Sequence, residues 1–210
     1  MNELERLLAA TDMLQVPKSP LHNASLRILF LLLYGTGMRI SEALALTLHD
    51  VDLAQQLVTV RDTKFFKTRQ VPIGPRLAAA LEEYLSRRRQ FQSPIDDASA
   101  FIVSSTGEHW KYRNVSKYFV QVRKAAGIQR EGTARYQPRI HDLRHTAAVH
   151  RVIAWYRTGA NVQRLLPQLA TYLGHVDVGS TQRYLTMTSE LLREASLRFE
   201  QYAKPENHRE

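Results

Sequence analysis

The stretch LHNASLRILFLLLYGTGMRISEALAL, residues 21–46, is the most informative part of the sequence for predicting the fold. Its leucine-rich first part predicts a long, mostly buried helix that ends at Gly35 or Gly37, because glycine commonly closes a helix. A second helix is expected over Ser41–Leu48, with its first residue as a candidate cap. The glycine turn between the two helices therefore places Arg39 at the N-terminus of the second helix.

Glu42 follows Arg39 by three positions, so the two side chains share one face of the expected helix. The carboxylate lies within reach of the guanidinium, where a hydrogen bond would fix the orientation of the arginine. Arginine offers a planar fork of donors that grips a phosphate in a way that lysine cannot. Taken alone, the segment is equally compatible with an ordinary ion pair on a helix surface.

The rest of the sequence predicts a mainly helical α+β fold with a small antiparallel three-stranded sheet. Further helices are indicated by apolar periodicity over residues 3–12, 75–91, 114–126, 141–145, 162–173, 178–187 and 190–203. The stretch LVTVRDTKFFKTRQVPIG (57–74) predicts the sheet, with a basic turn between strands, and AFIVSS (100–105) predicts one more short strand. We expect a single domain over residues 1–204 and a disordered tail over 205–210.

Charge and composition narrow the class of protein. Lys and Arg number 29 against 20 Asp and Glu, giving a formal charge of +9. This balance favours a polyanionic partner, because neutralising phosphates releases counterions, although a basic solvated surface gives the same balance. The absence of cysteine excludes disulfides, cysteine-ligated zinc and thiol catalysis. The apolar run Ile28–Tyr34 is too short to span a membrane and the N-terminus does not resemble a signal peptide, so we expect a soluble, cytoplasmic protein.

Further candidate residues lie in the second half of the chain. In HDLRH, His141 and Arg144 are three positions apart and share a helix face, which His145 can also share. Histidines four apart occur in zinc enzymes, but this segment lacks the glutamate of that motif and no third ligand is evident. We therefore expect no metal, and interpret His145 as a hydrogen-bonding residue beneath the site. His175 stands in LGH, nine residues before Tyr184 in STQRYL.

The candidate residues named so far, together with Lys64 in the basic turn, are suited to one kind of chemistry. Two arginines, two histidines and a lysine can hold and neutralise a phosphodiester, and a tyrosine hydroxyl can attack it. The chemistry requires no cofactor, since neither a metal nor a nucleotide has a part in it. A tyrosine in such a helix is, by itself, more often a packing residue.

In order and approximate spacing, these motifs resemble those of the tyrosine recombinases, which include phage and transposon integrases and chromosome-dimer resolvases. TGMRISEALAL resembles the family's first arginine box, VPIG after a basic hairpin resembles its lysine turn, and HDLRHT with LGH and TQRYL resembles its second box. The resemblance covers nearly the whole chain. It implies a catalytic domain that binds double-stranded DNA and cleaves and rejoins strands through a 3′-phosphotyrosine. The catalytic positions that it implies are Arg39, Lys64, His141, Arg144, His175 and the nucleophile Tyr184, with Glu42 as acidic support.

The sequence departs from the family's pattern in three places. The basic turn is bulkier than usual, so that Lys67 is an alternative to Lys64. The stretch between Arg144 and His175 is longer than in typical relatives, which predicts an extended helix pair or loop around residues 155–164. Relatives also usually carry an N-terminal helical domain that closes around DNA. This chain begins where their catalytic domain begins, as expected for a catalytic fragment or a natural short form.

Alternative functions and partners stay open at this stage. A type IB topoisomerase uses a similar set of residues, a non-catalytic DNA-binding regulator fits the missing clamp domain, and a zinc hydrolase is a more distant alternative. The resemblance implies a homo-oligomer, a tetramer on DNA, in which the helix over 190–203 packs on its own domain or docks on a neighbour. That helix carries an expected apolar stripe of Leu192, Ala195, Phe199 and Tyr202. Arg87–Arg89 are compatible with a ridge that contacts phosphates, but we favour the solvated end of a helix.

Overall fold

A computed structural model describes residues 2–14, 21–61, 68–91, 96–130, 136–174 and 189–203. The chain divides into two compact units, Met1–Arg144 and His145–Glu210, and each is described by itself. The single domain expected over residues 1–204 stays a prediction.

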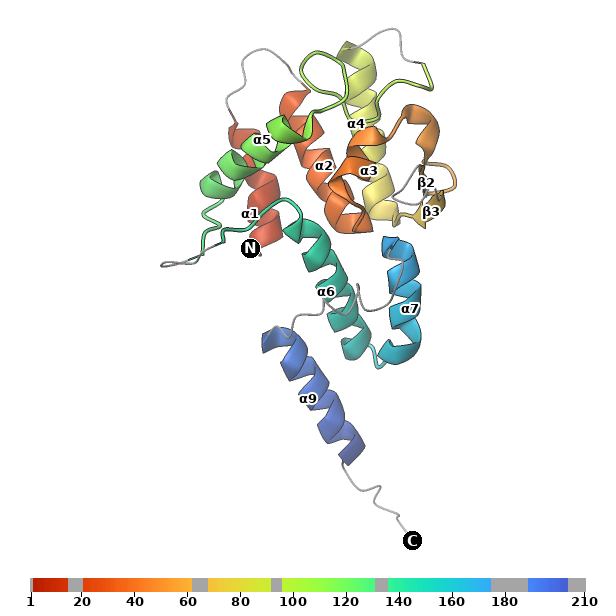
Figure 1. Cartoon of the computed structure of the whole chain (residues 1–210), viewed down its shortest axis with the longest axis vertical. Coiled ribbons are helices and arrows are strands. Elements are labelled where there is room, and N and C mark those ends of the chain that lie inside the picture. The colour runs from red at the N-terminus through yellow and green to blue at the C-terminus, as the bar shows by residue number, and fades with distance from the viewer. Residues whose placement is uncertain are drawn as a thin grey trace. The chain divides into compact units, whose positions relative to one another are not determined.

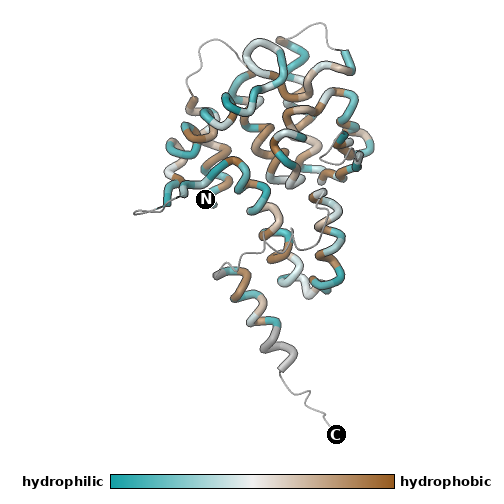
Figure 2. The backbone as a smooth tube through the Cα atoms, in the orientation of Figure 1, coloured by the Kyte–Doolittle hydropathy of each residue, from teal (hydrophilic) through white to brown (hydrophobic). Residues whose placement is uncertain are grey.

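The first unit is built around one buried helix. Its α-helices are α1 (Glu3–Ala10), α2 (His22–Thr36), α3 (Ile40–Ala45), α4 (Pro75–Phe91) and α5 (Tyr112–Ala125). Helix α2 contacts α1, α3 and α4, as Figure 1 shows, and Leu26, Leu29, Phe30 and Leu32 on it are fully buried. Because its neighbours cover it on several sides, α2 is apolar around most of its circumference (Figure 2). The prediction of a long buried helix is confirmed.

The turn after α2 is fixed by glycine. Gly37 adopts a left-handed conformation with φ 63°, and its amide donates to the carbonyl of Leu33 at 2.9 Å. The predicted end at Gly37 is therefore confirmed. Ser41 as the cap of the next helix is wrong, since α3 begins at Ile40 and Arg39 occupies the cap position. The carboxylate of Glu42 accepts the backbone amide of Arg39 at 2.8 Å, which satisfies that donor and lets the helix start earlier.

The small sheet follows α3 and confirms the predicted antiparallel three-stranded arrangement. Its strands, in the order β1-β2-β3, are β1 (Val51–Asp52), β2 (Leu57–Val60) and β3 (Arg69–Pro72). In the β2–β3 register Val60 pairs with Arg69 and Val58 with Val71, and the side chains of both Val58 and Val71 are fully buried. The residues between β2 and β3 that include Lys64 lie outside the described part of the chain.

Two sequence-based expectations in the first unit are wrong. The strand predicted over 100–105 is not formed; the segment makes only isolated bridges in the described residues, from Ala100 to Thr47 and from Val103 to His109. Its apolar residues are buried in succession, without the alternation of a half-buried strand. The expected solvated end of α4 fails at Arg88, which is 2% exposed, with its guanidinium donating to the carbonyl of Phe101 at 3.4 Å.

The second unit is helical in its described residues. Its elements are the part of α6 (Asp142–Arg157) from His145 onward, α7 (Val162–Leu173) and α9 (Ser189–Ala203). Helix α7 begins at the cap Asn161, whose side chain accepts from the amide of Arg164 at 3.1 Å, and ends at Gly174 in a left-handed conformation. The helix pair expected around residues 155–164 is thus present. The helix predicted over 178–187 lies outside the described residues.

Helix α9 packs on its own unit through Leu191, and the predicted stripe fails at Leu192; the side chains of Phe199 and Tyr202 in that stripe lie outside the described residues. Leu191 is buried with residues of α6 and α7, while Leu192 is 49% exposed. Arg157 of α6 also forms ion pairs with α9, to Glu190 at 2.7 Å and to Glu194 at 3.0 Å. Among the described helices, none combines the length and the apolar character that crossing a membrane requires.

His22 is a buried histidine at the start of α2. It is 2% exposed, and neither ring nitrogen has a hydrogen-bond partner among the described residues. Its ring lies 5.0 Å from that of Trp110 and 4.4 Å from that of Tyr118. Burial lowers the pKa of His22, because a charged imidazolium loses its hydration there.

We predict that His22 makes the fold sensitive to mild acid. A histidine whose pKa is lowered in the folded state binds fewer protons than in the unfolded chain, so stability falls as the pH drops below about 6.5. His22→Phe should leave the free energy of unfolding at pH 7.5 within about 1 kcal/mol of the wild-type value. Between pH 7.5 and pH 5, that free energy should fall less in the variant than in wild type. Urea unfolding at both pH values measures this, with the exposed His49→Gln as control. Parallel losses in wild type and His22→Phe would contradict it.

Candidate active site

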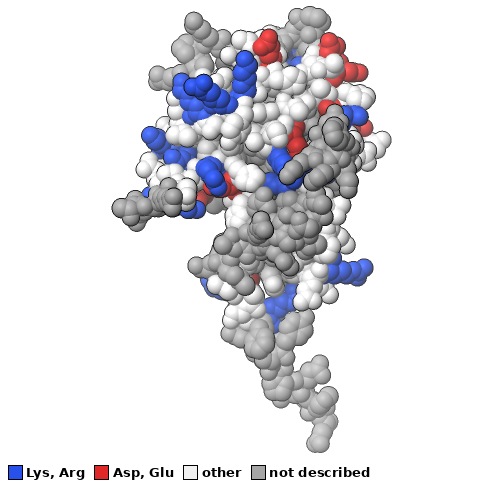
Figure 3. Space-filling view, viewed as in Figure 1, with Lys and Arg blue, Asp and Glu red and all other residues white. Residues whose placement is uncertain are grey.

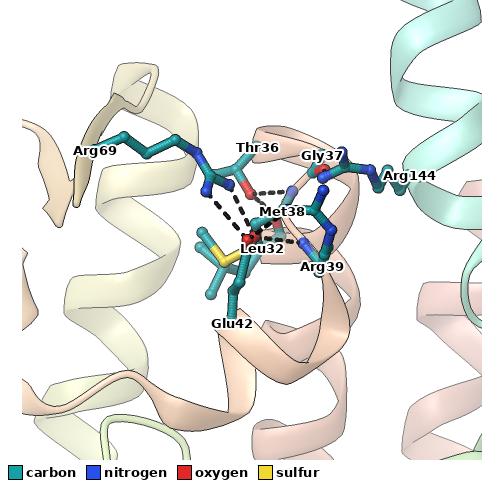
Figure 4. A network of polar contacts seen from close by, with 8 residues as sticks. All are labelled: Leu32, Thr36, Gly37, Met38, Arg39, Glu42, Arg69 and Arg144. Carbon is teal, nitrogen blue, oxygen red and sulfur yellow. Dashed lines mark hydrogen bonds and ion pairs between the residues drawn. The ribbon is translucent and has the colours of Figure 1, made fainter. Parts of the chain in front are cut away.

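The turn at Gly37 and the sheet meet at the carboxylate of Glu42. Arg39 donates to it twice, through its backbone amide at 2.8 Å and through Nη1 at 2.9 Å. Arg69, at the start of β3, donates through Nη1 at 3.1 Å and Nη2 at 2.8 Å. Figure 4 shows both guanidinium groups converging on this carboxylate. The expected hydrogen bond between Arg39 and Glu42 is therefore present, and a second arginine joins it.

These three side chains differ in their exposure. The Glu42 side chain is 6% exposed and that of Arg69 is 14% exposed, so the pair between them is largely withdrawn from water. Arg39 is 33% exposed and reaches towards the surface. Burial alone would raise the pKa of Glu42, but the hydrogen bonds from Arg69 and Arg39 outweigh burial and lower that pKa below its usual value. Glu42 is therefore ionised at neutral pH.

Arg144 reaches the same turn from a distant part of the sequence. It lies in the first turn of α6 and is 2% exposed. Its Nη1 donates to the carbonyl of Gly37 at 2.5 Å, across 107 positions of sequence. The glycine that closes α2 therefore also holds Arg144 close to Arg39, as Figure 4 shows.

His141 stands at the surface, one residue before α6. The turn there is fixed by Asp142, whose carboxylate accepts the amide of Arg139 at 2.9 Å. Partial desolvation of the ring lowers the pKa of His141, and the charge of Arg144 lowers it further, even though the residue as a whole is exposed. The imidazole is therefore neutral at pH 7 and able to accept a proton.

The described residues bring together part of the predicted site. Arg39, Glu42, Arg144 and His141 lie in the first unit, whereas His145 belongs to the second. Lys64, Lys67, His175 and Tyr184 lie outside the described residues. No group of three or more His, Cys, Asp or Glu side chains within the described ranges is arranged to hold a metal ion.

Arg69 was missed by the sequence analysis. It stands in TRQVPIG, in the same stretch as the lysine turn, and one of several basic residues there. Its place could have been inferred from strand alternation: Val71 is buried, and residues two apart share a face of the sheet, so Arg69 points to the covered side. A cation on that side requires an acidic partner, and Glu42 is the nearby candidate.

Basic side chains also gather on one outer face of the first unit. Helix α5 buries Val115, Phe119 and Val122, so that these apolar residues belong to the core. Its opposite side exposes Arg113, Lys117 and Lys124, and Lys111, which caps the helix, is also exposed. Figure 3 shows Lys and Arg side chains concentrated over this helix. The arrangement gives the unit a positive surface suited to a polyanion.

Comparison with known proteins gives a consistent result. Residues 1–190 match the phage integrase family. The Sinorhizobium fredii protein y4rB, whose name calls it an integrase/recombinase, is 37% identical over 202 residues, which cover 94% of this chain and 63% of that protein. Tyrosine recombinase XerC 2 of Ralstonia nicotianae is 35% identical over 193 residues, covering 92% of this chain and 50% of that protein. The chain thus spans only about half to two thirds of the length of these relatives.

Solved structures show the same fold. A crystal structure of XerA recombinase superposes with a TM-score of 0.73 at 26% identity, covering 96% of this chain and 63% of that one. A lambda integrase tetramer bound to a Holliday junction gives 0.61 at 19% identity, covering 87% of this chain and 46% of that one. The second likeness concerns the fold alone.

We predict that Glu42 stabilises the fold through its two arginines, and that acid removes this effect. A carboxyl with a lowered folded pKa contributes stability above its unfolded pKa, near 4.3, and loses it as the pH falls through the folded value. Glu42→Gln should lower the free energy of unfolding by about 2 kcal/mol at pH 7, because it leaves the buried Arg69 without a charged partner. The difference from wild type should shrink at pH 3.

Urea unfolding at pH 7 and pH 3 measures this contribution of Glu42. Glu83→Gln is the matched control, since Glu83 forms an exposed ion pair with Arg87. The control should change stability by less than about 0.5 kcal/mol. Equal effects of the two substitutions at pH 7 would contradict the prediction.

Proposed function

Because this chain belongs to the phage integrase family, we propose that it is a site-specific DNA recombinase that cleaves and rejoins DNA strands through a 3′-phosphotyrosine. The observation that carries the proposal is the convergence of Arg39 and Arg144 on the turn at Gly37. A scissile phosphate gains negative charge on its non-bridging oxygens in the transition state. Two preorganised guanidinium groups stabilise that charge, the dominant effect expected at such a site.

The remaining steps are assigned by resemblance to the family. The hydroxyl of Tyr184 attacks the phosphorus, a 3′-phosphotyrosyl bond forms, and the 5′-oxygen departs. A phenol has a pKa near 10 and needs a base; the neutral imidazole of His141 is suited to take its proton. Lys64 protonates the leaving 5′-oxygen and His175 donates a hydrogen bond to the phosphate. His145 supports the site from beneath. The phosphotyrosine conserves the bond energy, so that rejoining needs no ATP.

The partners are part of the same proposal. Double-stranded DNA is the substrate, supported by the formal charge of +9 and by the exposed basic side of α5. The acting form is a homo-tetramer on DNA, like the lambda integrase tetramer bound to a Holliday junction. A DNA substrate of this kind places the protein in the cytoplasm, and we propose that residues 1–204 act as one catalytic domain.

Helix α9 offers a surface for that assembly. Its buried side, through Leu191, packs in its own unit. Leu192 at 49% and Leu197 at 44% are among the large apolar side chains that stay exposed. Covering an exposed apolar side chain with a partner lowers the free energy of the assembly. We therefore propose that the side of α9 that carries Leu192 docks on a neighbouring protomer.

Covalent trapping tests the proposed chemistry. On a nicked duplex built from DNA flanking the gene, the short 5′-hydroxyl strand diffuses away after cleavage and leaves the protein attached to DNA. In EDTA, wild type should give a slow band on a denaturing gel and Tyr184→Phe should give none. An adduct in both would place the nucleophile elsewhere. DNA binding without any adduct would favour the non-catalytic regulator, and joining without site preference would favour a topoisomerase.

Paired leucine substitutions test the docking of α9. Leu192→Ser should leave the melting temperature within about 2 °C of wild type, since the side chain is half exposed, while reducing tetramers on DNA in mass photometry. Leu191→Ser should instead destabilise the second unit, because a buried leucine is lost, at a cost of about 3 kcal/mol. If Leu192→Ser assembles like wild type, the proposed docking through this side is wrong.

A further inference from the structure

Glu42 accepts hydrogen bonds from two arginines, and the three charged side chains together keep a net positive charge. Each of its oxygens accepts one hydrogen bond from each arginine: Oε1 from the side chains of both, Oε2 from the backbone of Arg39 and the side chain of Arg69. Two guanidinium groups and one carboxylate give this trio a formal charge of +1. A pair of Arg39 and Glu42 alone would be formally neutral.

The carboxylate has two opposing effects on phosphate binding. Its hydrogen bonds hold Arg39 in place, which favours a defined contact with a phosphate. Its negative charge repels the same phosphate, and this repulsion is poorly screened because the Glu42 side chain is only 6% exposed. An orienting carboxylate beside an anion-binding arginine therefore needs a second cation.

We propose that Arg69 is a positioning residue that offsets the charge of Glu42, so that Glu42 orients Arg39 without cancelling its attraction for the scissile phosphate. This inference rests on the proposed function, because it concerns the same phosphate. Arg69 makes two of the four hydrogen bonds to the carboxylate and is itself 14% exposed. Its pairing with Val60 in the sheet holds the backbone of Arg69 in place. It acts through Glu42 and needs no contact with DNA.

A double-mutant cycle tests this role. The rate of covalent adduct formation is measured at saturating nicked DNA for wild type, Arg69→Met, Glu42→Gln and the double variant. Arg69→Met should slow cleavage roughly 10–100-fold, the size seen when a partner that orients a site residue is lost. In the Glu42→Gln background, with no charge to offset, the same substitution should cost less than about threefold. Equal costs in both backgrounds would overturn the proposal.

Further comparisons separate charge balance from folding and from the basic turn. Arg69→Lys keeps the charge and should stay within about threefold of wild type; a loss as large as that of Arg69→Met, at unchanged melting temperature, overturns the proposal even if Arg69→Met folds poorly. A substrate with sulfur at the 5′-bridging position needs no general acid. If it restores cleavage by Arg69→Met, Arg69 acts on the leaving group, and charge balance at Glu42 is wrong.

The matched control is Arg61→Met, since Arg61 directly follows the neighbouring strand β2 and pairs with Asp50 at 2.6 Å. It should cleave within about twofold of wild type, and a loss equal to that of Arg69→Met would overturn the specific role of Arg69. The wild-type result distinguishes failure of the proposed function from failure of the role of Arg69. No adduct from wild type contradicts the proposed function, and with it the role of Arg69. A wild-type adduct with additive variants contradicts Arg69 alone.

Discussion

A buried carboxylate is stable only when positive or hydrogen-bonding groups replace its lost water, and in this chain that requirement organises the site. Glu42 meets it with four hydrogen bonds from two arginines. One of them fixes the start of α3, and two tie that helix to the first residue of β3. The placement of Arg39 therefore depends on the sheet as well as on its own helix.

The left-handed turn at Gly37 extends this organisation to the third arginine. A residue with a side chain is disfavoured at φ 63°, and glycine accepts that conformation without strain. The turn leaves the carbonyl of Gly37 directed at Arg144. Because Arg144 is nearly fully buried, this carbonyl is a substantial part of what orients its guanidinium. One short turn thus positions two cations, Arg39 and Arg144, that lie far apart in the sequence of the first unit.

The end of α2 and the pairing of Arg39 with Glu42 could be predicted from the sequence, because both depend on residues that are close together in the chain. Glycine after a leucine-rich run indicates a helix end, and a spacing of three indicates that Arg39 and Glu42 meet. The burial of individual side chains was harder to predict, because it depends on tertiary packing. Arg88 looked solvated within a run of arginines, yet the segment after α4 covers it. Leu191 and Leu192 are both apolar neighbours in the sequence, and it is packing against residues of α6 and α7 that buries Leu191.

The charges gathered around the turn also link substrate binding to proton transfer. Partial desolvation and the positive charge of Arg144, with smaller effects from Arg139 and Arg39, lower the pKa of His141. In the proposed reaction a phosphodiester bound between the arginines would offset part of their positive charge. The same imidazole would then hold a proton more tightly, since a nearby anion favours the charged form of histidine. By linkage, the proposed site would accept a proton more readily with the phosphodiester bound, which is the step at which the proposed nucleophile Tyr184 would lose its proton.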